Sequence, residues 1–356
     1  MFFDFLARTT NLEKYYLYVP KICLRVMGFW PASPRTQLIN VWSVFNFLIL
    51  LIGVLTELHA GFSLLSTNLE KALDTLCPAG TSAVTVLKMI LISYYRKDFI
   101  LVLEKMHQML FGDYRKDNKY VLAYKRIIRH HSVMAARVNF TPFLAGFITC
   151  TAYNLKPLVL AWIFWSKGKE IVWLTPFNMT MPPVFVHGLL YPLGYLFTAY
   201  TGYVTIFMFG GCDALYFEYC AHIAALLKML QVDVKLLFAK FNEKLSLNAE
   251  DSLYMEQQLK LIIRRHNAII EMTNFFRQRY AIITLAHFVS ASMVIGASIF
   301  EMMTYSGFGR FIYLGYTVAA LSQLAVYCYG GTLVAENSVH LSTVIFKCNW
   351  FICSPR

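Results

Sequence analysis

Charged residues are scarce in this sequence of 356 residues: Asp, Glu, Lys and Arg make up 15%, whereas 58% of the residues are hydrophobic and 16% are aromatic. Soluble domains are usually about 45–50% apolar and about 25% charged, so this chain could not cover itself with a normal solvated surface. The scarcity of charge excludes a soluble globular protein. Together with a mean hydropathy of +0.51, it predicts an all-α polytopic membrane protein.

The sequence also lacks the motifs of catalysis and metal binding. It has no glycine-rich phosphate loop, no His-Glu-x-x-His pattern and no Ser/His/Asp group in a suitable context. Its eight cysteines include no Cys-x-x-Cys pair and no metal-type spacing with histidine. We therefore expect no enzyme, no metal and no cofactor. A disulfide between Cys77 and Cys150 requires both to lie near the outer face, and free thiols are the favoured expectation.

Six apolar stretches are long enough to cross a bilayer. A helix rises about 1.5 Å per residue, so about 20 apolar residues cross a hydrocarbon core of about 30 Å. The predicted spans are residues 38–59, 72–94, 138–160, 184–209, 280–303 and 311–330. The last of these helices is expected to break at Gly330 and Gly331 and to continue as a polar amphipathic segment.

The distribution of basic residues predicts the orientation. When the connections are assigned to alternate sides, 26 Lys and Arg residues lie on the side of the N-terminus and five on the other side. Because basic residues favour the cytoplasmic side, we expect a cytoplasmic N-terminus, which opposes a G-protein-coupled receptor. The sequence Asn178-Met179-Thr180 then lies outside, where Asn178 is a candidate for glycosylation.

The connection 210–279 is too long and too regularly apolar for a loop. Leucine, isoleucine and valine recur at helical spacing on both sides of a polar break at residues 248–251. The pattern predicts two helices that extend the fourth and fifth spans into the cytoplasm. Their apolar stripes pack either on each other, as a hairpin within the chain, or on other subunits, and both interpretations stay open.

The C-terminal region resembles that of insect odorant receptors. The family pattern is a Tyr-Cys-aromatic-Gly turn, a serine about eight residues later, a short apolar helix, a tryptophan, and a Ser-Pro before a basic residue. The matching residues are Tyr327, Cys328, Tyr329, Gly330, Ser338, Trp350, Ser354, Pro355 and Arg356. The resemblance implies a seventh membrane helix beyond Arg356, which this sequence does not contain. A chain without that helix is expected to contribute no wall to an ion pore.

Further positions resemble the same family. Asp213, Cys220 and His222 are similar to the exit of its fourth span, and Arg265-His266 with Ile269-Ile270 is similar to the approach to its fifth. The resemblance thus covers residues 210–356 by motifs and 1–209 by topology. It implies three parts: residues 1–209 with spans one to four, 210–279 as an anchor region where four subunits meet, and 280–356. The implied subunit-anchor residues are Asp213, His222, His266, Ser338 and Trp350.

The resemblance also implies a ligand cavity between the spans in the outer half of the bilayer. Aromatic and hydroxyl side chains there suit small volatile ligands, which need shape and dispersion contacts more than ion pairs. Tyrosine is also common at membrane interfaces and threonine at helix contacts, so each residue has a structural alternative. The candidate ligand-binding residues are Thr81, Thr85, Phe147, Thr151, Tyr191, Tyr195, Tyr313, Tyr316 and Thr317.

Ionisable residues inside or at the ends of the spans have simpler interpretations. Lys88 lies two turns from the inner end of its span, so we expect its ammonium group to extend along the helix to the cytoplasm. Glu57 and Glu301 are expected at solvated outer helix ends. His287 is expected to be a hydrogen-bonded membrane histidine rather than a ligand-binding residue.

These features predict an odorant-binding receptor subunit in the plasma membrane of sensory neurons. By the resemblance, its partners are a small volatile odorant, membrane lipid and the odorant receptor co-receptor, with which it forms a tetrameric, ligand-gated cation channel. No nucleic acid is expected. A gustatory receptor of the same superfamily is the first alternative, and a G-protein-coupled receptor is the second.

Overall fold

The structure is a computed structural model that describes residues 13, 16–32, 36–112, 118–170, 173–241, 247–304 and 308–352. Ser354, Pro355 and Arg356 of the C-terminal motif lie outside these residues. The described residues form helices and their connections, with no strand, which confirms the expected all-α class. The helices are α1 (Tyr18–Val26), α2 (Gln37–Leu64), α3 (Leu69–Tyr94), α4 (Arg96–Phe111), α5 (Asn118–Ser166), α6 (Pro183–Val186), α7 (Tyr191–Ala239), α8 (Ala249–Thr304), α9 (Phe308–Lys347) and the short 3₁₀ helix η3 (Trp350–Ile352).

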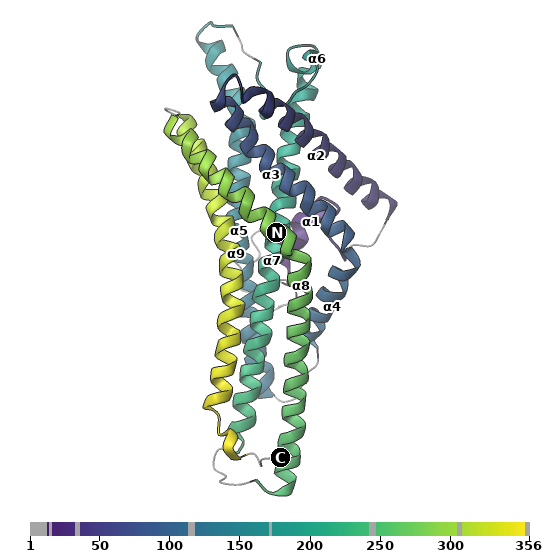
Figure 1. Ribbon diagram of the computed structural model, residues 1–356. Coiled ribbons are helices and arrows are strands. Elements are labelled where there is room, and N and C mark those ends of the chain that lie inside the picture. Colours follow the sequence, from purple (N-terminus) through teal and green to yellow (C-terminus); the bar gives the residue numbers. More distant parts are fainter. Residues whose placement is uncertain are drawn as a thin grey trace.

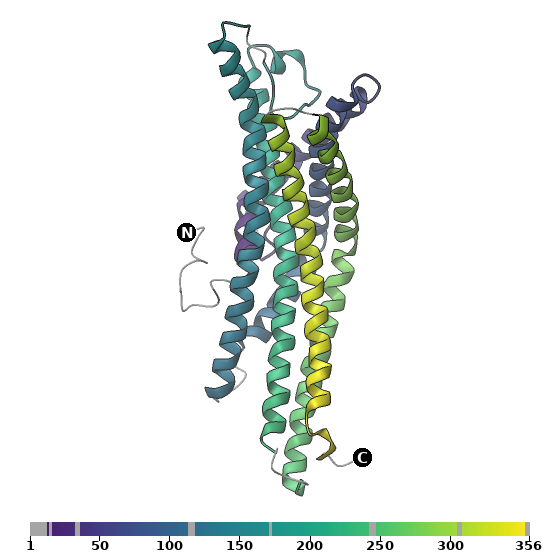
Figure 2. The same ribbon diagram turned by 90° about the vertical axis from the view of Figure 1, so that its left-hand side faces the viewer.

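The long helices α5, α7, α8 and α9 lie side by side in an elongated bundle (Figures 1 and 2). Helix α6, the C-terminal end of α8 and the N-terminal end of α9 lie at one end, and η3 lies at the other. Helix α7 is central: α1, α3, α5, α8 and α9 all pack against it, and most of its residues are buried. Helices α2 and α3 add a further layer on the half of the bundle that carries α6.

Five helices within the described residues are long and apolar enough to cross a membrane: α2, α3, α5, α8 and α9. They correspond to five of the six expected spans. Helix α7, which holds the expected span 184–209, is not among them. Because α7 is surrounded by other helices, it can carry small and polar side chains that a lipid-facing helix could not.

The expected span 184–209 was also wrong at its start. Residues 183–186 form the separate helix α6, and α7 begins only at Tyr191, with a proline in its first turn. Gly194 allows α6 to lie against α7, because a methyl group at this position would be 2.4 Å from the carbonyl oxygen of Phe185. The glycine therefore supports a close approach of two backbones.

The long helices α5, α7, α8 and α9 all continue far beyond the expected spans, and the extensions of α7 and α8 are those that the sequence predicts. Helix α7 runs unbroken to Ala239, and α8 runs unbroken from Ala249 to Thr304. The predicted polar break between them is confirmed, because the side chain of Asn248 accepts a hydrogen bond of 2.7 Å from the backbone N–H of Asp251 and caps α8.

The expected break at Gly330 and Gly331 does not exist. Helix α9 continues through both glycines to Lys347. A methyl group at Gly330 would lie 3.3 Å from ring atoms of Tyr216 and Phe217 on α7. The glycine thus permits close packing of α9 on α7, which offsets its low helix propensity.

Candidate functional site

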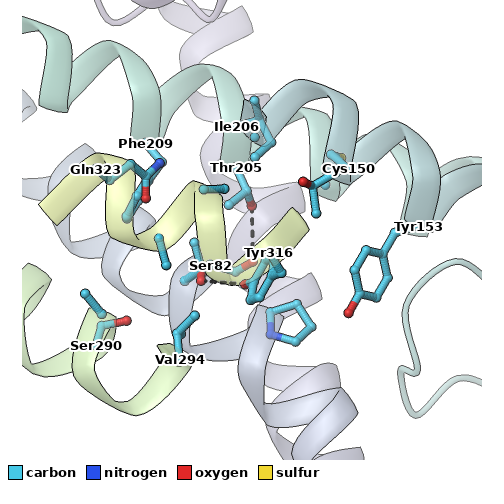
Figure 3. Close-up of a pocket in the computed structure, with 18 of the residues that line it drawn as sticks. Ser82, Cys150, Tyr153, Thr205, Ile206, Phe209, Ser290, Val294, Tyr316 and Gln323 are labelled. Atoms are coloured by element: carbon cyan, nitrogen blue, oxygen red, sulfur yellow. Dashed lines mark hydrogen bonds between the residues drawn. The ribbon is translucent and has the colours of Figure 1, made fainter. Parts of the chain in front are cut away.

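A cavity of about 70 Å³ lies between α3, α5, α7, α8 and α9 in the half of the bundle that carries α6 (Figure 3). Its wall is mostly apolar. Small residues leave the space, and four aromatic rings surround it. The small residues are Gly146, Gly202, Ala291, Ala319 and Ala320, and the rings are Tyr153, Phe177, Phe209 and Tyr316.

Four hydroxyl groups of the wall are paired with one another. Thr81 on α3 and Tyr316 on α9 are joined by a hydrogen bond of 2.9 Å between their oxygens. Ser82 on α3 and Thr205 on α7 are joined in the same way at 3.1 Å (Figure 3). These two hydrogen bonds join α3 to α7 and to α9 at the cavity wall. A molecule in the cavity would therefore contact both hydrogen-bonded pairs.

A buried ion pair lies one side chain beyond the wall. The Nζ atom of Lys88 on α3 is 2.5 Å from Oδ1 of Asp213 on α7 and 3.4 Å from the centre of the Phe209 ring. The hydroxyl of Tyr327 on α9 donates to the same carboxylate oxygen at 2.6 Å. Since the Lys88 side chain is completely buried, the expectation that it reaches the cytoplasm was wrong: a counter-charge on α7 holds it inside the bundle.

A second, more polar cavity of about 260 Å³ lies on the side of the wall formed by the residue 173–178 segment. It is lined by Lys71, Asp74 and Lys156, among others, and three residues line both cavities: Pro78, Tyr153 and Phe177. The rings of Tyr153 and Phe177 are stacked, with centres 5.7 Å apart. These shared residues therefore form the wall between the two cavities.

Two carboxylates near this end were expected in solvent, and that expectation was wrong. The residue-level exposure of Glu57 on α2 is 2%, and that of Glu301 on α8 is 0%. Both helix ends are covered because α2 packs on α3, and α8 packs on α3 and α9.

Two of the nine candidate ligand-binding residues, Thr81 and Tyr316, line the cavity. Thr85 and Thr317 are buried and donate to carbonyl oxygens of their own helices. The hydroxyl of Tyr313 donates to Asp74 at 2.6 Å.

The candidates on α5 and α7 also lie outside the lining. Phe147 packs against the Tyr203 ring, with centres 5.7 Å apart, and the Thr151 and Tyr203 hydroxyls are 3.4 Å apart. The hydroxyls of Tyr191 and Tyr195 donate to the backbone carbonyls of Leu174 and Asn154. These groups hold the surrounding helices and the residue 173–178 segment in place.

The α5 residues that do line the cavity were missed. The lining face carries Gly146, Thr149, Cys150 and Tyr153, so it is rotated away from the face of Phe147 and Thr151. The glycine at residue 146 was the available signal, because a helix face at a cavity or close contact favours small residues. Cys77 and Cys150 are both free thiols.

The implied anchor residues are spread along the bundle. Asp213 belongs to the ion pair near the cavity. His222 is buried, and its Nε2 is 3.2 Å from the hydroxyl of Ser132 on α5. His266 is half-buried, whereas Ser338 and Trp350 are exposed near the C-terminal end. The predicted glycosylation residue, Asn178, is exposed, and its amide donates to Thr75 at 3.2 Å.

Comparison with known proteins gives concordant results. Residues 68–356 match the family model described as 7tm Odorant receptor. The chain is 50% identical to Odorant receptor 10a and 33% identical to Odorant receptor 24a, both of Drosophila melanogaster. Each alignment covers 99% of this chain and 87% of the relative.

Solved structures show the same fold at low sequence identity. The insect olfactory receptor OR5 from Machilis hrabei is 16% identical, with a TM-score of 0.73 over 95% of this chain and 83% of that chain. The same receptor in complex with eugenol gives a TM-score of 0.74 over 96% of this chain and 84% of that chain. The arrangement of helices described above is therefore that of a known receptor fold.

Proposed function

Because this chain belongs to the odorant receptor family, we propose that it is the odorant-binding subunit of a ligand-gated cation channel and that it works with the odorant receptor co-receptor in a heteromeric tetramer. The cavity carries this proposal. It is small, mostly apolar and surrounded by five helices, which suits a volatile molecule held by shape and dispersion contacts. One receptor of this fold is known with eugenol, a small phenol, and a ligand of that size class is proposed here.

The position of the cavity supports a gating role. Its wall contains hydroxyl pairs that join α3 to α7 and α9, and the ion pair behind it joins the same three helices. A ligand that fits the cavity better in one arrangement of these helices shifts the population toward that arrangement by the difference in affinity. Thr81 and Tyr316 are the proposed ligand contacts from the predicted set.

The proposed orientation places the N-terminus in the cytoplasm and Asn178 outside, where it carries a glycan, in the plasma membrane of sensory neurons. The 26-to-5 asymmetry of basic residues supports the orientation. On this topology the C-terminal halves of α7 and α9 and the N-terminal half of α8 lie in the cytoplasm.

We assign subunit contact to this cytoplasmic region, which includes His222, His266, Ser338 and Trp350. Helices α7 and α8 already pack on each other there, as in the stacked rings of Tyr219 and Phe276. Several large apolar side chains of this region are nevertheless exposed, because no other part of this chain covers them: Leu253, Leu261, Ile263, Val339, Phe346, Trp350 and Phe351. An exposed apolar surface of this kind is typical of an interface, which favours packing on other subunits.

The experiment is to express the receptor with the co-receptor and to record odorant-evoked current with and without a filled cavity. Ala320 on α9 lines the cavity, whereas Ala325 on the same helix is exposed. We expect Ala320→Phe to raise the half-maximal odorant concentration by about tenfold or more, because the added ring occupies the ligand's space at a cost of about 1–3 kcal/mol.

The matched control Ala325→Phe should leave the dose–response curve unchanged. Both variants are compared at equal surface expression. If the receptor adds no odorant response beyond that of the co-receptor alone, the proposed function is wrong. If Ala320→Phe responds like the unchanged receptor, the proposed cavity is wrong.

A further inference from the structure

The cavity wall contains an imidazole that is fully buried and has no hydrogen-bond partner among the described residues. His287 on α8 is 1% exposed, and neither of its ring nitrogens, Nδ1 and Nε2, has a partner among the described residues. A buried polar group without a hydrogen bond is unfavourable, and such groups are uncommon in native structures. The expectation that His287 is a satisfied structural histidine is therefore wrong.

The ring of His287 is held by aromatic contacts. It is stacked on Tyr327, with ring centres 4.5 Å apart and planes at 22°, and it contacts Phe209 at 5.4 Å. Phe209 and Tyr327 contact Lys88 and Asp213, respectively. The imidazole thus has a fixed place in the wall while its polar atoms stay free.

Most other polar groups of the wall are hydrogen-bonded, partly exposed or shared with the more polar second cavity. Thr81 is bonded to Tyr316 and Ser82 to Thr205, and the hydroxyl of Thr149 donates to the carbonyl of Ala145. A ligand would have to break one of these bonds to pair with these hydroxyls, whereas pairing with His287 breaks none. Ser290, Gln323 and Tyr153 also lack a hydrogen bond among the described residues, but the first two are half-buried and Tyr153 also lines the more polar second cavity. The imidazole, in contrast, is 1% exposed. The gain on binding is therefore largest at the imidazole.

We propose that His287 is the polar anchor of the cavity and that it hydrogen-bonds the single oxygen-bearing group of a neutral volatile ligand. This inference rests on the proposed function of the cavity as an odorant site. A neutral imidazole has one N–H donor and one acceptor nitrogen, so it accommodates a carbonyl acceptor or a hydroxyl donor. The ligand class is therefore aldehydes, ketones, esters, alcohols and phenols.

The surroundings exclude other ligand classes. A carboxylate would need a free counter-charge, but Lys88 is paired with Asp213 and lies behind the Phe209 ring. A pure hydrocarbon would fill the apolar space and leave the imidazole unpaired. A site that hydrogen-bonds its ligand discriminates strongly against an analogue that lacks the polar group, because the buried partner then stays unsatisfied.

The test uses pairs of volatile probes with the same shape: benzaldehyde with styrene, benzyl alcohol with ethylbenzene, and hexanal with heptene. The receptor is expressed with the co-receptor, and current is recorded against the concentration of each probe. Ligand-induced thermal stabilisation of the purified complex provides a second measurement that does not depend on gating. We expect the oxygenated member of each pair to be more potent by about tenfold or more, the ratio that one buried hydrogen bond supplies.

His287→Phe should abolish this preference. The variant should respond more weakly to the oxygenated probe, and its response to the hydrocarbon should be unchanged. His287→Gln, which retains a donor and an acceptor, should restore part of it. Ser292→Ala, a change at an exposed position of the same helix outside the cavity, should leave the preference intact.

The inference is overturned if the unchanged receptor shows no oxygen preference in either measurement, or if His287→Phe keeps it. A third result would refute the anchor but not the odorant cavity. In that case both probe types bind, Ala320→Phe blocks their binding, and His287→Phe does not change it. If no probe acts on the unchanged receptor by current or stabilisation, the proposed function fails and the anchor with it.

Discussion

Replacing Lys88 with methionine tests the buried ion pair behind the cavity. The substitution keeps the length and much of the volume of the side chain but removes its charge. In the intact protein the carboxylate of Asp213 accepts from Lys88 at 2.5 Å and from Tyr327 at 2.6 Å, both at Oδ1. Its other oxygen, Oδ2, has no partner among the described residues. Without Lys88 the buried carboxylate retains the Tyr327 hydroxyl as its neutral donor.

The expected loss of stability follows from this burial. The exposed fractions of the two side chains are 0% for Lys88 and 6% for Asp213. Removing one partner of such a pair costs about 3–5 kcal/mol, because the remaining charge stays buried and uncompensated. Replacing both partners with apolar residues is often nearly neutral. The double variant Lys88→Met/Asp213→Leu should therefore recover most of the stability that Lys88→Met loses.

The measurement is the thermal stability of the detergent-solubilised receptor, followed by size-exclusion chromatography of a fluorescently tagged chain. For a loss of this size we expect the midpoint of Lys88→Met to fall by an amount of the order of 10 °C. The matched control is Lys105→Met, because Lys105 is paired at 2.8 Å with Glu271 on the surface, where the exposed fractions are 40% and 74%. Its midpoint should not change, since exposed pairs contribute little.

Two results would refute the reasoning. If Lys88→Met is as stable as the unchanged receptor, the ammonium group is solvated or the carboxylate is neutral, and the pair does not hold the three helices together. If the double variant is no more stable than Lys88→Met alone, the loss comes from packing around residue 88 rather than from an unpaired charge.

Two further predictions concern packing and topology. Gly211→Ala should destabilise the receptor by about 1–3 kcal/mol, because the new methyl group would lie 2.9 Å from Cβ of Cys23 and push α1 away from α7. The control Gly296→Ala, whose methyl group meets nothing within 4 Å, should be neutral or slightly stabilising. Equal thermal midpoints for the two variants would contradict this prediction. Asn178→Gln should remove a glycosidase-sensitive shift in gel mobility, and an epitope at Met1 should be labelled only after permeabilisation; labelling on intact cells would reverse the proposed orientation.

The sequence was informative where the physical cause is local. Helical periodicity and the scarcity of charge predict long apolar helices, and the polar residues 248–251 predict the turn between α7 and α8, because Asn248 caps the next helix by itself. At Gly330 the same local logic was misleading. Glycine has a low helix propensity, but the aromatic rings of Tyr216 and Phe217 that need its small size lie on another helix.

The same distinction explains the candidate site. Thr81 and Tyr316 were predicted from their hydroxyl groups, but on α5 the composition of one helix could not show which face meets the cavity. Periodicity identifies a face that is shared by residues four apart, whereas its direction depends on how α5 rotates against α7. Gly146 is the one local sign in the sequence of which face of α5 lines the cavity, because its small size suits that face.

The buried ionisable groups show where reasoning along one helix ends. Lys88 was judged by its distance from the end of its own span, yet its environment is set by Asp213, 125 residues away in the sequence. For His287 the decisive fact is not a contact but a missing one, and a missing hydrogen bond becomes visible only when every neighbouring helix is in place. Polar groups inside a membrane bundle are expensive to bury, so those without a structural partner are where a ligand has the most to gain. This is why the imidazole, which is both unpaired and fully buried, carries the proposal for odorant selectivity.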